Sequence, residues 1–415
     1  MRPTTSRTES LPRLAARWCS LAPDIESVRG VRVPESLPPD LVALRDRIRS
    51  FIEEDLRPLE AGLDTDGPIP AEIRARVRER SKALGLFGMT QPKSIGGTEA
   101  GPLAMVVARE TLAAGNSGLT RGVFGPGPGM LARAEGELRT RYLDPVLRGE
   151  SVGAFAFTEP SGPGAPDRPT WAKRDGDDFV VTGKKGFVSG GATADFYQVI
   201  VNVDEDATGP GGTAVLLIDR GTPGVSIERD FVSMEGGGHV ELCFDGARIS
   251  KANMLGKVGE GMPRAMGNIN EERVEVAASA CGIAMWTVEY LTRHITGGHR
   301  AGGRLSDREG VRLRYSDLRI ETYIARAMLY RTARLLDSGD DAINEAAMTK
   351  VFCTEAAGRI VDGAVQLVGG QALIVGHPLE RLYRRVRSLR LTGGASDILR
   401  LNVARGIIEF NAGRL

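Results

Sequence analysis

The sequence predicts an α+β fold with a helical N-terminal region, a middle region that forms a β-barrel, and a C-terminal bundle of four helices. Two changes of periodicity carry this prediction. Near Ser151 the helical spacing of apolar residues gives way to short β-rich runs, and near Gly261 the helical spacing returns and continues to the end. A chain of 415 residues has room for about two to four structural units.

The N-terminal region divides into an arm and a helical domain. Residues 1–38 are of mixed character and close on SLPP, which predicts a loosely ordered arm. From Leu41 onward, apolar residues recur at helical spacing over 39–150. One helix begins near Pro70 and ends before Gly85, which is the usual asymmetry of helix ends.

The middle region, residues 151–258, reads as a compact antiparallel barrel or sandwich. Its apolar runs are short and are separated by Gly, Pro and Asp turns at intervals of roughly ten to twenty residues. The runs are GAFAFTEP, FVVTGKKGFVSGG, FYQVIVNVD, GTAVLLID, GVSIERDF and HVELCFDGARIS.

The C-terminal region, residues 259–415, is helical throughout. Four long segments have apolar residues at a period of 3.6, at 271–296, 309–336, 341–367 and 395–411. Long helices joined by short links are typical of a four-helix bundle.

Composition excludes several classes of function. The formal net charge of +1 provides no general field for nucleic acid or an anionic membrane. No stretch of 18 uncharged apolar residues occurs, which argues against a membrane-spanning helix. The four cysteines lie far apart and the four histidines form no ligand-like cluster, so we expect no metal site and a reducing, cytoplasmic location.

Two β-rich segments have the residue types that a flavin needs. FAFTEP (155–160) and GKKGFVSGG (183–191) combine aromatic and hydroxyl side chains on short strands. A planar heteroaromatic ring needs a flat apolar surface and hydrogen-bond donors to its polar edge. An ordinary sheet face with two turns would have the same composition, so these residues alone do not decide between the two interpretations.

The order of the motifs resembles the acyl-CoA dehydrogenase family over residues 40–412. The segments that carry the resemblance are RYLDPVLRGE, FAFTEP, GKKGFVSGG, FDGARIS with LGKVGEGM, NEERVEVAASACGIA, QLVGG, PLERLYRRVR and LTGGASDILRLNVAR. The resemblance implies the same three-part fold, FAD held between barrel and bundle, and oxidation of the Cα–Cβ bond of an acyl thioester.

The resemblance also bears on the base that removes the α-proton. In many family members this base is the Glu of a YEGTSEI-like motif, but here Gly393 stands at that position, followed by Gly394. One branch, similar to isovaleryl- and long-chain acyl-CoA dehydrogenases, takes its base from a Glu-Arg pair in the first bundle helix. Glu272 and Arg273 match that pair, so we expect Glu272 to be the base, with Arg273, Gly393 and Gly394 lining the substrate pocket. Glu271 is the fallback, although one residue along a helix points about 100° away.

For the cofactor, the resemblance implies contacts with FAD from Phe155, Phe157, Thr158, Phe187, Val188 and Ser189. Gln366, Gly369 and Gly370 match a stretch that approaches the flavin pyrophosphate from a neighbouring subunit, which implies a homodimer or homotetramer. The pattern departs from the family in the loop after Pro160, at Ala395, and at GHRAG, where Arg300 is a displaced candidate for a cofactor-binding arginine.

The expected partners are an acyl-CoA or acyl-carrier-protein thioester and an electron acceptor, either a flavoprotein or oxygen. Two alternatives remain open from the sequence. One is a flavin-dependent monooxygenase or oxidase on the same fold, which needs no α-proton base and so tolerates Gly393. The other is a non-catalytic homologue that binds flavin or has lost it. The arginine-rich segment 381–390 lacks the interleaved aromatic residues typical of a nucleic-acid site.

Overall fold

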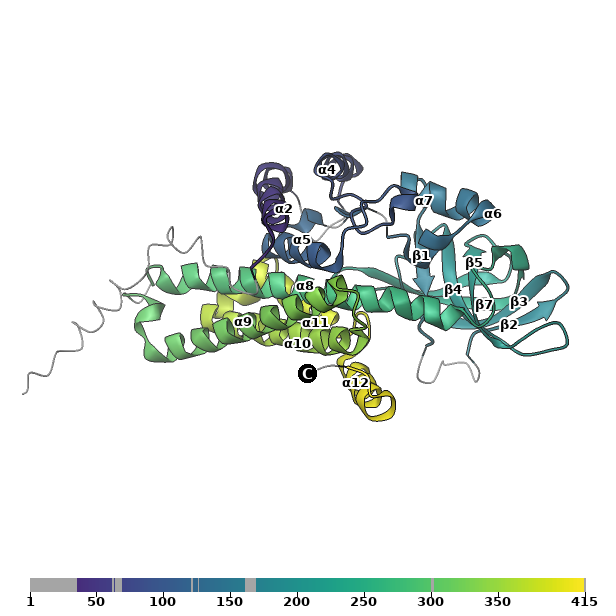
Figure 1. Ribbon diagram of the computed structural model, residues 1–415. Coiled ribbons are helices and arrows are strands. Elements are labelled where there is room, and N and C mark those ends of the chain that lie inside the picture. The colour runs from purple at the N-terminus through teal and green to yellow at the C-terminus, as the bar shows by residue number, and fades with distance from the viewer. Residues whose placement is uncertain are drawn as a thin grey trace, which may run out of the picture. The chain divides into compact units, whose positions relative to one another are not determined.

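The computed structural model describes residues 36–61, 63, 69–120, 122–125, 127–160, 169–299 and 302–413, so most of the predicted arm lies outside the described residues. The first part of the chain is helical, as Figure 1 shows. Its elements are α2 (Pro39–Ser50), η2 (Phe51–Leu56), α3 (Arg57–Glu60), α4 (Ala71–Ala83), η3 (Lys93–Ile95), α5 (Pro102–Ala114), η4 (Gly118–Thr120), η5 (Gly129–Arg133), α6 (Gly136–Leu138), η6 (Arg139–Leu143) and α7 (Asp144–Arg148).

Seven strands form one curled sheet in the middle of the chain. They are β1 (Gly153–Ala156), β2 (Trp171–Asp175), β3 (Asp178–Ser189), β4 (Phe196–Val203), β5 (Gly212–Asp219), β6 (Val225–Val232) and β7 (Gly238–Ser250). Their order is β1-β4-β2-β3-β7-β6, with β5 paired to β4. The expectation of a wholly antiparallel sheet was wrong, because β1 runs parallel to β4 from Gly153 opposite Phe196 to Ala156 opposite Val199.

Strands β4 and β5 are buried on both faces, which explains their nearly continuous apolar sequences. One face, with Tyr197 and Leu216, lies in the core of the curled sheet. The opposite face, with Phe196 and Leu217, packs in a second core with Leu131 and other residues of the N-terminal helical region. The sheet is therefore fixed to the helices that precede it.

Five helices follow the short helix η7 (Lys251–Asn253). They are α8 (Gly261–Thr296), α9 (Glu309–Asp337), α10 (Ile343–Val368), α11 (Pro378–Leu389) and α12 (Ser396–Phe410), with short 3₁₀ turns η8 (Leu305–Asp307) and η9 (Gly370–Leu373). Helix α8 begins ten residues before the predicted segment 271–296.

The fourth helix beside α8, α9 and α10 is α11, which the periodicity prediction omitted. Helix α11 packs against both α8 and α10, and the four helices run alongside one another in Figure 1. Helix α12, predicted as the fourth member, packs on α10 through Leu399 and Val403, which contact a cluster with Ala347 and Val351. Helix α11 has only 12 residues and three buried ones, Leu379, Leu382 and Val386, which explains why a search for long apolar segments missed it.

Helix α5 packs against α8 and α9, so it extends the bundle. Its contact with α8 is close at Gly282, where an added Cβ would lie 2.3 Å from the carbonyl oxygen of Glu110. Across to α9, the buried carboxylate of Glu110 accepts hydrogen bonds from Arg326 (2.7 and 3.0 Å) and from the Tyr330 hydroxyl (2.7 Å). None of the helices among the described residues is long and apolar enough to cross a membrane.

Candidate functional site

The turn between α11 and α12 lies against α8, and this contact brings Gly393 to Glu272. Gly393 has φ +65°, a conformation that favours glycine. A Cβ added at Gly393 would lie 3.9 Å from the carboxyl carbon of Glu272 and 3.8 Å from Cγ of Arg273. The residue proposed as the base and the position that lacks a side chain thus face each other directly.

Arg273 supports this turn from within the protein. Its side chain is buried, with 5% exposure. Its Nε donates to the carbonyl oxygen of Gly393 at 3.2 Å, and a terminal nitrogen donates to Oδ1 of Asn270 at 2.6 Å. We predicted Arg273 as a substrate contact, whereas in the structure its donors are directed at the turn.

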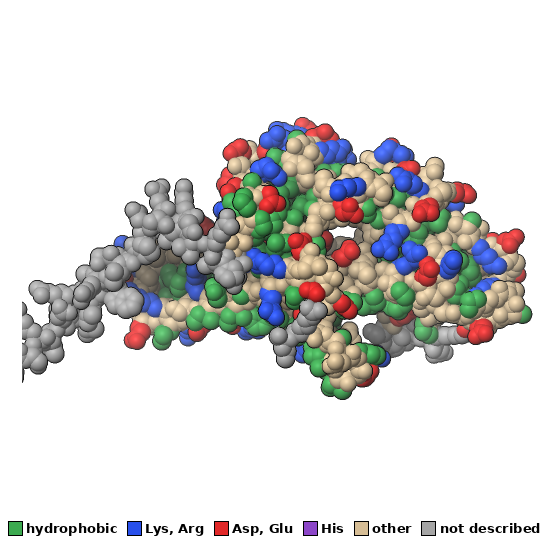
Figure 2. Space-filling view, in the orientation of Figure 1, with side chains coloured by type: hydrophobic (Ala, Val, Ile, Leu, Met, Phe, Trp, Pro, Cys, Tyr) green, Lys and Arg blue, Asp and Glu red, His purple; other side chains and the backbone are tan. Residues whose placement is uncertain are grey.

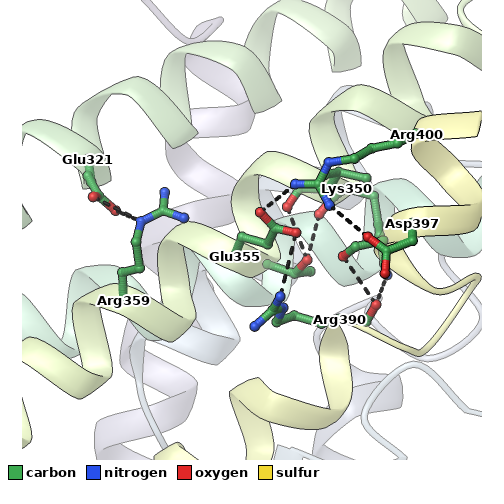
Figure 3. Close-up of polar contacts among 10 residues, drawn as sticks. Glu321, Lys350, Glu355, Arg359, Arg390, Asp397 and Arg400 are labelled. Atoms are coloured by element: carbon green, nitrogen blue, oxygen red, sulfur yellow. Dashed lines mark hydrogen bonds and ion pairs between the residues drawn. The ribbon is translucent and has the colours of Figure 1, made fainter. Parts of the chain in front are cut away.

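A second buried cation, Lys350 of α10, supports the same turn. Its Nζ donates to the carbonyl oxygens of Arg390 (3.0 Å) and Gly394 (2.7 Å). Figure 3 shows Lys350 on α10 near Glu355, with Arg390 and Arg400 approaching from the neighbouring segments. The sequence analysis missed Lys350. The available signal was a lysine at a core position of an apolar helix, within MTKVF.

The surroundings of Glu272 raise the pKa of its carboxyl. Burial is the largest cause, and the negative charge of Glu275 acts in the same direction. The positive charges of Lys350, Arg109 and Arg273 oppose it. A carboxylate with a raised pKa is a stronger base, which suits the removal of a weakly acidic proton. Glu271, which the sequence offered as the fallback base, is more exposed than Glu272.

Arg109 of α5 and Glu275 of α8 form an ion pair one helical turn from Glu272, with 2.6 Å between Arg109 Nη2 and the Glu275 carboxylate. The guanidinium of Arg109 also stacks over the ring of Phe124, with its carbon 4.4 Å from the ring centroid. Figure 2 shows an opening between the N-terminal helices and the sheet region, with acidic side chains at its rim.

The cofactor residues predicted on two strands meet at the ends of β1 and β3. The strand β1 ends at Ala156, so Phe157 and Thr158 follow it directly. The amide of Gly186 in β3 donates to the carbonyl of Thr158 at 2.8 Å. This bond places Thr158 next to Gly186, the residue that precedes Phe187.

A β-bulge directs Phe187 out of the sheet. The register of β3 on β7 shifts between Lys185 and Val188, and Phe187 within the bulge has φ +55°. A positive φ is strained for a phenylalanine, and such strain concentrates at functional sites. The ring is 58% exposed and meets Phe231 edge-on, with 5.7 Å between centroids.

The other predicted flavin residues differ in what they expose. Ser189 is exposed, whereas the Val188 side chain is buried in the sheet core, so only its backbone can meet a cofactor. Phe155 and Phe157 are partly buried against the core between sheet and helices, with their rings 5.7 Å apart. Both rings therefore pack against this core and leave only part of their surface available to a cofactor.

Glu159 and Lys185 hold the two strand ends together. The Glu159 carboxylate accepts hydrogen bonds from the Thr170 amide (3.2 Å) and hydroxyl (3.1 Å), and it forms an ion pair with Lys185. Lys185 Nζ also donates to the Phe157 carbonyl at 3.1 Å. Burial lowers the pKa of Lys185, opposed by Glu159. The acidic residue of FAFTEP therefore has a structural role here.

Gln366, Gly369 and Gly370 lie at the other end of α10 from Lys350. Sixteen residues separate Lys350 from Gln366 on this helix, which corresponds to roughly 24 Å at 1.5 Å per residue. A single chain does not bring them to Glu272. An added Cβ at Gly369 or Gly370 would meet nothing within 4 Å, so this end of α10 has open space for a ligand. Arg300 lies outside the described residues.

The exposed groups on the strands fit a flavin. The strained, outward-facing Phe187 ring supplies an aromatic surface, and Thr158 and Ser189 supply exposed hydroxyls on adjacent backbone. This combination of stacking surface and polar groups matches the chemistry of an isoalloxazine ring. Among the described residues, no group of three or more His, Cys, Asp or Glu side chains could hold a metal ion.

Thr158→Val is expected to weaken FAD retention about fivefold, because one hydrogen bond is worth roughly 1 kcal/mol net. The barrel core should be unaffected, since Thr158 is exposed. FAD affinity is measured by fluorescence during reconstitution of the apoprotein. Thr182→Val, at an exposed position earlier on β3, is the matched control. Equal affinity for the two variants would remove Thr158 from the cofactor site.

Comparisons with known proteins agree over most of the described chain. Family models described as the N-terminal, middle and C-terminal domains of acyl-CoA dehydrogenase match residues 38–150, 154–247 and 259–408. An acryloyl-CoA reductase (NADH) of Anaerotignum propionicum is 30% identical, over 93% of this chain and 98% of that protein. The human mitochondrial short-chain specific acyl-CoA dehydrogenase is 30% identical, over 90% and 91%. A solved structure of a probable acyl-CoA dehydrogenase of Mycobacterium abscessus is 27% identical, with TM-score 0.77, over 89% and 99%.

Proposed function

The chain belongs to the acyl-CoA dehydrogenase family, and we propose that Glu272 is the base that removes the α-proton of its acyl-CoA substrate. Members of this family are FAD-dependent oxidoreductases that dehydrogenate acyl-CoA thioesters. The observation that carries the proposal for Glu272 is its distance of 3.9 Å from a Cβ at Gly393, the position of the missing glutamate.

FAD, when bound, supplies the acceptor for the hydride that leaves Cβ of the acyl chain. The protein's own part is to take the α-proton on the Glu272 carboxylate. Burial raises the pKa of Glu272 and so strengthens this base, and the neighbouring cations limit the rise of that pKa. Arg273 and Lys350 hold the opposite wall, the Gly393–Gly394 turn, in place.

We propose CoA rather than a carrier protein as the thioester carrier, an electron-transferring flavoprotein as acceptor, and a homodimer or homotetramer as the assembly. Exposed apolar side chains on α12, including Leu401, Ile408 and Phe410, support self-association. Three cysteines in the described part of the chain, Cys243, Cys281 and Cys353, are free, which supports a cytoplasmic location.

Anaerobic mixing with acyl-CoA thioesters tests this function. We expect the visible absorbance of the bound flavin to fall with acyl-CoA of suitable chain length, and to be unaffected by NADH or NADPH alone. Reduction by a nicotinamide, with oxygen consumption, would instead favour the monooxygenase or oxidase. A protein that stays colourless after incubation with excess FAD would support the non-catalytic alternative.

A further inference from the structure

The turn that faces Glu272 is held by two cationic side chains, Lys350 and Arg273. Three of its carbonyl oxygens, those of Arg390, Gly393 and Gly394, accept hydrogen bonds from the side chains of Lys350 or Arg273. The Arg390 carbonyl also accepts the Ser396 amide at 3.1 Å. Lys350 is therefore the side-chain donor specific to Gly394, and it acts directly behind the residue that faces the base.

Lys350 is completely buried, with 0% exposure. The charge of a buried ammonium group acts over a longer range than that of an exposed one, because the surrounding dielectric constant is low. The charged groups that act on it are Glu272, Glu355, Arg273 and Arg390. Glu355 is already paired with Arg400 (2.7 Å) and Arg390 (3.8 Å).

Glu272 is the carboxylate that remains to balance the charge of Lys350. Among the residues described, it forms no salt bridge within 4 Å, yet Lys350 is the largest of the cationic influences on its carboxyl pKa, ahead of Arg109 and Arg273. The described residues show no ion pair between Lys350 and Glu272, so the influence of Lys350 is a longer-range electrostatic one.

We propose that Lys350 is a positioning residue for the dehydrogenation, which fixes the Gly393–Gly394 turn and stabilises the ionised carboxylate of Glu272. The proposal rests on Glu272 being the base. It assigns to α10 a direct influence on proton removal that does not require contact with the substrate.

The test compares the pH dependence of flavin reduction by acyl-CoA in the wild-type holoenzyme with that of Lys350→Met and Lys350→Gln. The base must be ionised, so the rate rises with pH through the Glu272 pKa. Loss of the Lys350 charge raises this pKa and moves the rise to higher pH. On the acidic side we expect rates about 3- to 10-fold lower, corresponding to about half to one pH unit.

Each variant separates one part of the effect. Lys350→Gln retains a donor for the turn without the charge, and Lys350→Arg retains the charge and should restore the wild-type profile. Glu275→Gln removes a charge of opposite sign and should move the profile to lower pH. Arg405→Gln loses an exposed ion pair with Glu409 within α12 and should leave the profile unchanged.

Hydrogen exchange provides a readout that does not depend on turnover. Burial lowers the pKa of Lys350 to about 8, helped by the charge of Arg273, so its hold on the turn should weaken between about pH 7 and about pH 9. In the wild-type holoenzyme, amides 391–395 should then gain exchange rate relative to buried strand β4. This measurement stands even if the Lys350 variants fail to fold.

An unshifted profile in folded Lys350→Gln, or a constant exchange ratio in the wild type, would overturn the role of Lys350. Failure of the proposed base gives a different result, because Glu272→Gln would then reduce its flavin at the wild-type rate. The two outcomes are therefore distinguishable in the same set of measurements.

Discussion

Glu272→Gln is expected to slow flavin reduction by acyl-CoA by about 10²- to 10⁴-fold, the usual contribution of a positioned general base. The amide has the shape of the carboxylate but cannot accept the proton. Asp397, the carboxylate nearest to Gly393 in the segment LTGGASDILRLNVAR, has a side chain that is 96% exposed and pairs with Arg400, so it offers no replacement. Rapid mixing under anaerobic conditions measures the rate, and substrate binding should persist.

A second variant tests directly whether a carboxylate at position 393 can replace the one at position 272. In the Glu272→Gln background, Gly393→Glu should recover part of the activity, because a Cβ at Gly393 would lie without a clash, at ordinary contact distance from the side chain of residue 272. The recovery should be incomplete, since φ +65° at this position costs a non-glycine residue roughly 1 kcal/mol or more. Wild-type reduction rates in Glu272→Gln alone would exclude this residue as the base.

Glu110→Ala is expected to destabilise the protein by about 2–4 kcal/mol, because it leaves the buried Tyr330 hydroxyl and the partly exposed Arg326 guanidinium without their partner. Glu110 is only 3% exposed and accepts three hydrogen bonds from Arg326 and Tyr330. Equilibrium unfolding in urea, followed by circular dichroism, measures the effect if the transition is reversible.

The control is an ion pair between α9 and α10 at the surface, labelled in Figure 3. Glu321 and Arg359 lie 3.0 Å apart but are 29% and 50% exposed, so Glu321→Gln should cost less than about 1 kcal/mol. Replacing Glu110 by Leu and Arg326 by Met together should cost much less than Glu110→Ala alone. Similar losses for Glu110→Ala and Glu321→Gln would contradict the role given to burial.

The sequence predicted the order of helices and strands because periodicity is a local property. It also indicated Glu272 through the vacancy at Gly393, a pair of residues 121 positions apart that the structure brings into contact. The parallel pairing of β1 with β4 could not be predicted in this way, since strand neighbours depend on tertiary packing. The burial of Val188 inside the sheet follows from a bulge whose position has no clear signature in the local sequence.

Lys350 shows the same limit at the site. A lysine at a core position of an apolar helix indicates a buried cation but does not identify its partners. The acceptors of Lys350 are backbone carbonyls of a turn about 40 residues away. Because carbonyl groups are present at every residue, no sequence motif identifies them as partners. Only the fold reveals that two cations hold the glycine turn that faces Glu272.

Helix α5 belongs to the N-terminal part of the chain but packs against the C-terminal helices α8 and α9. This packing limits where the protein can be cut into independent pieces. Helix α5 approaches α8 closely at Gly282. The buried carboxylate of Glu110 on α5 is paired with Arg326 of α9. A truncation near residue 150 would therefore expose an apolar helix face and a charged arginine on the remaining fragment. Neither piece is expected to be a self-sufficient module, so insertions, fusions and recombination points belong elsewhere in the chain.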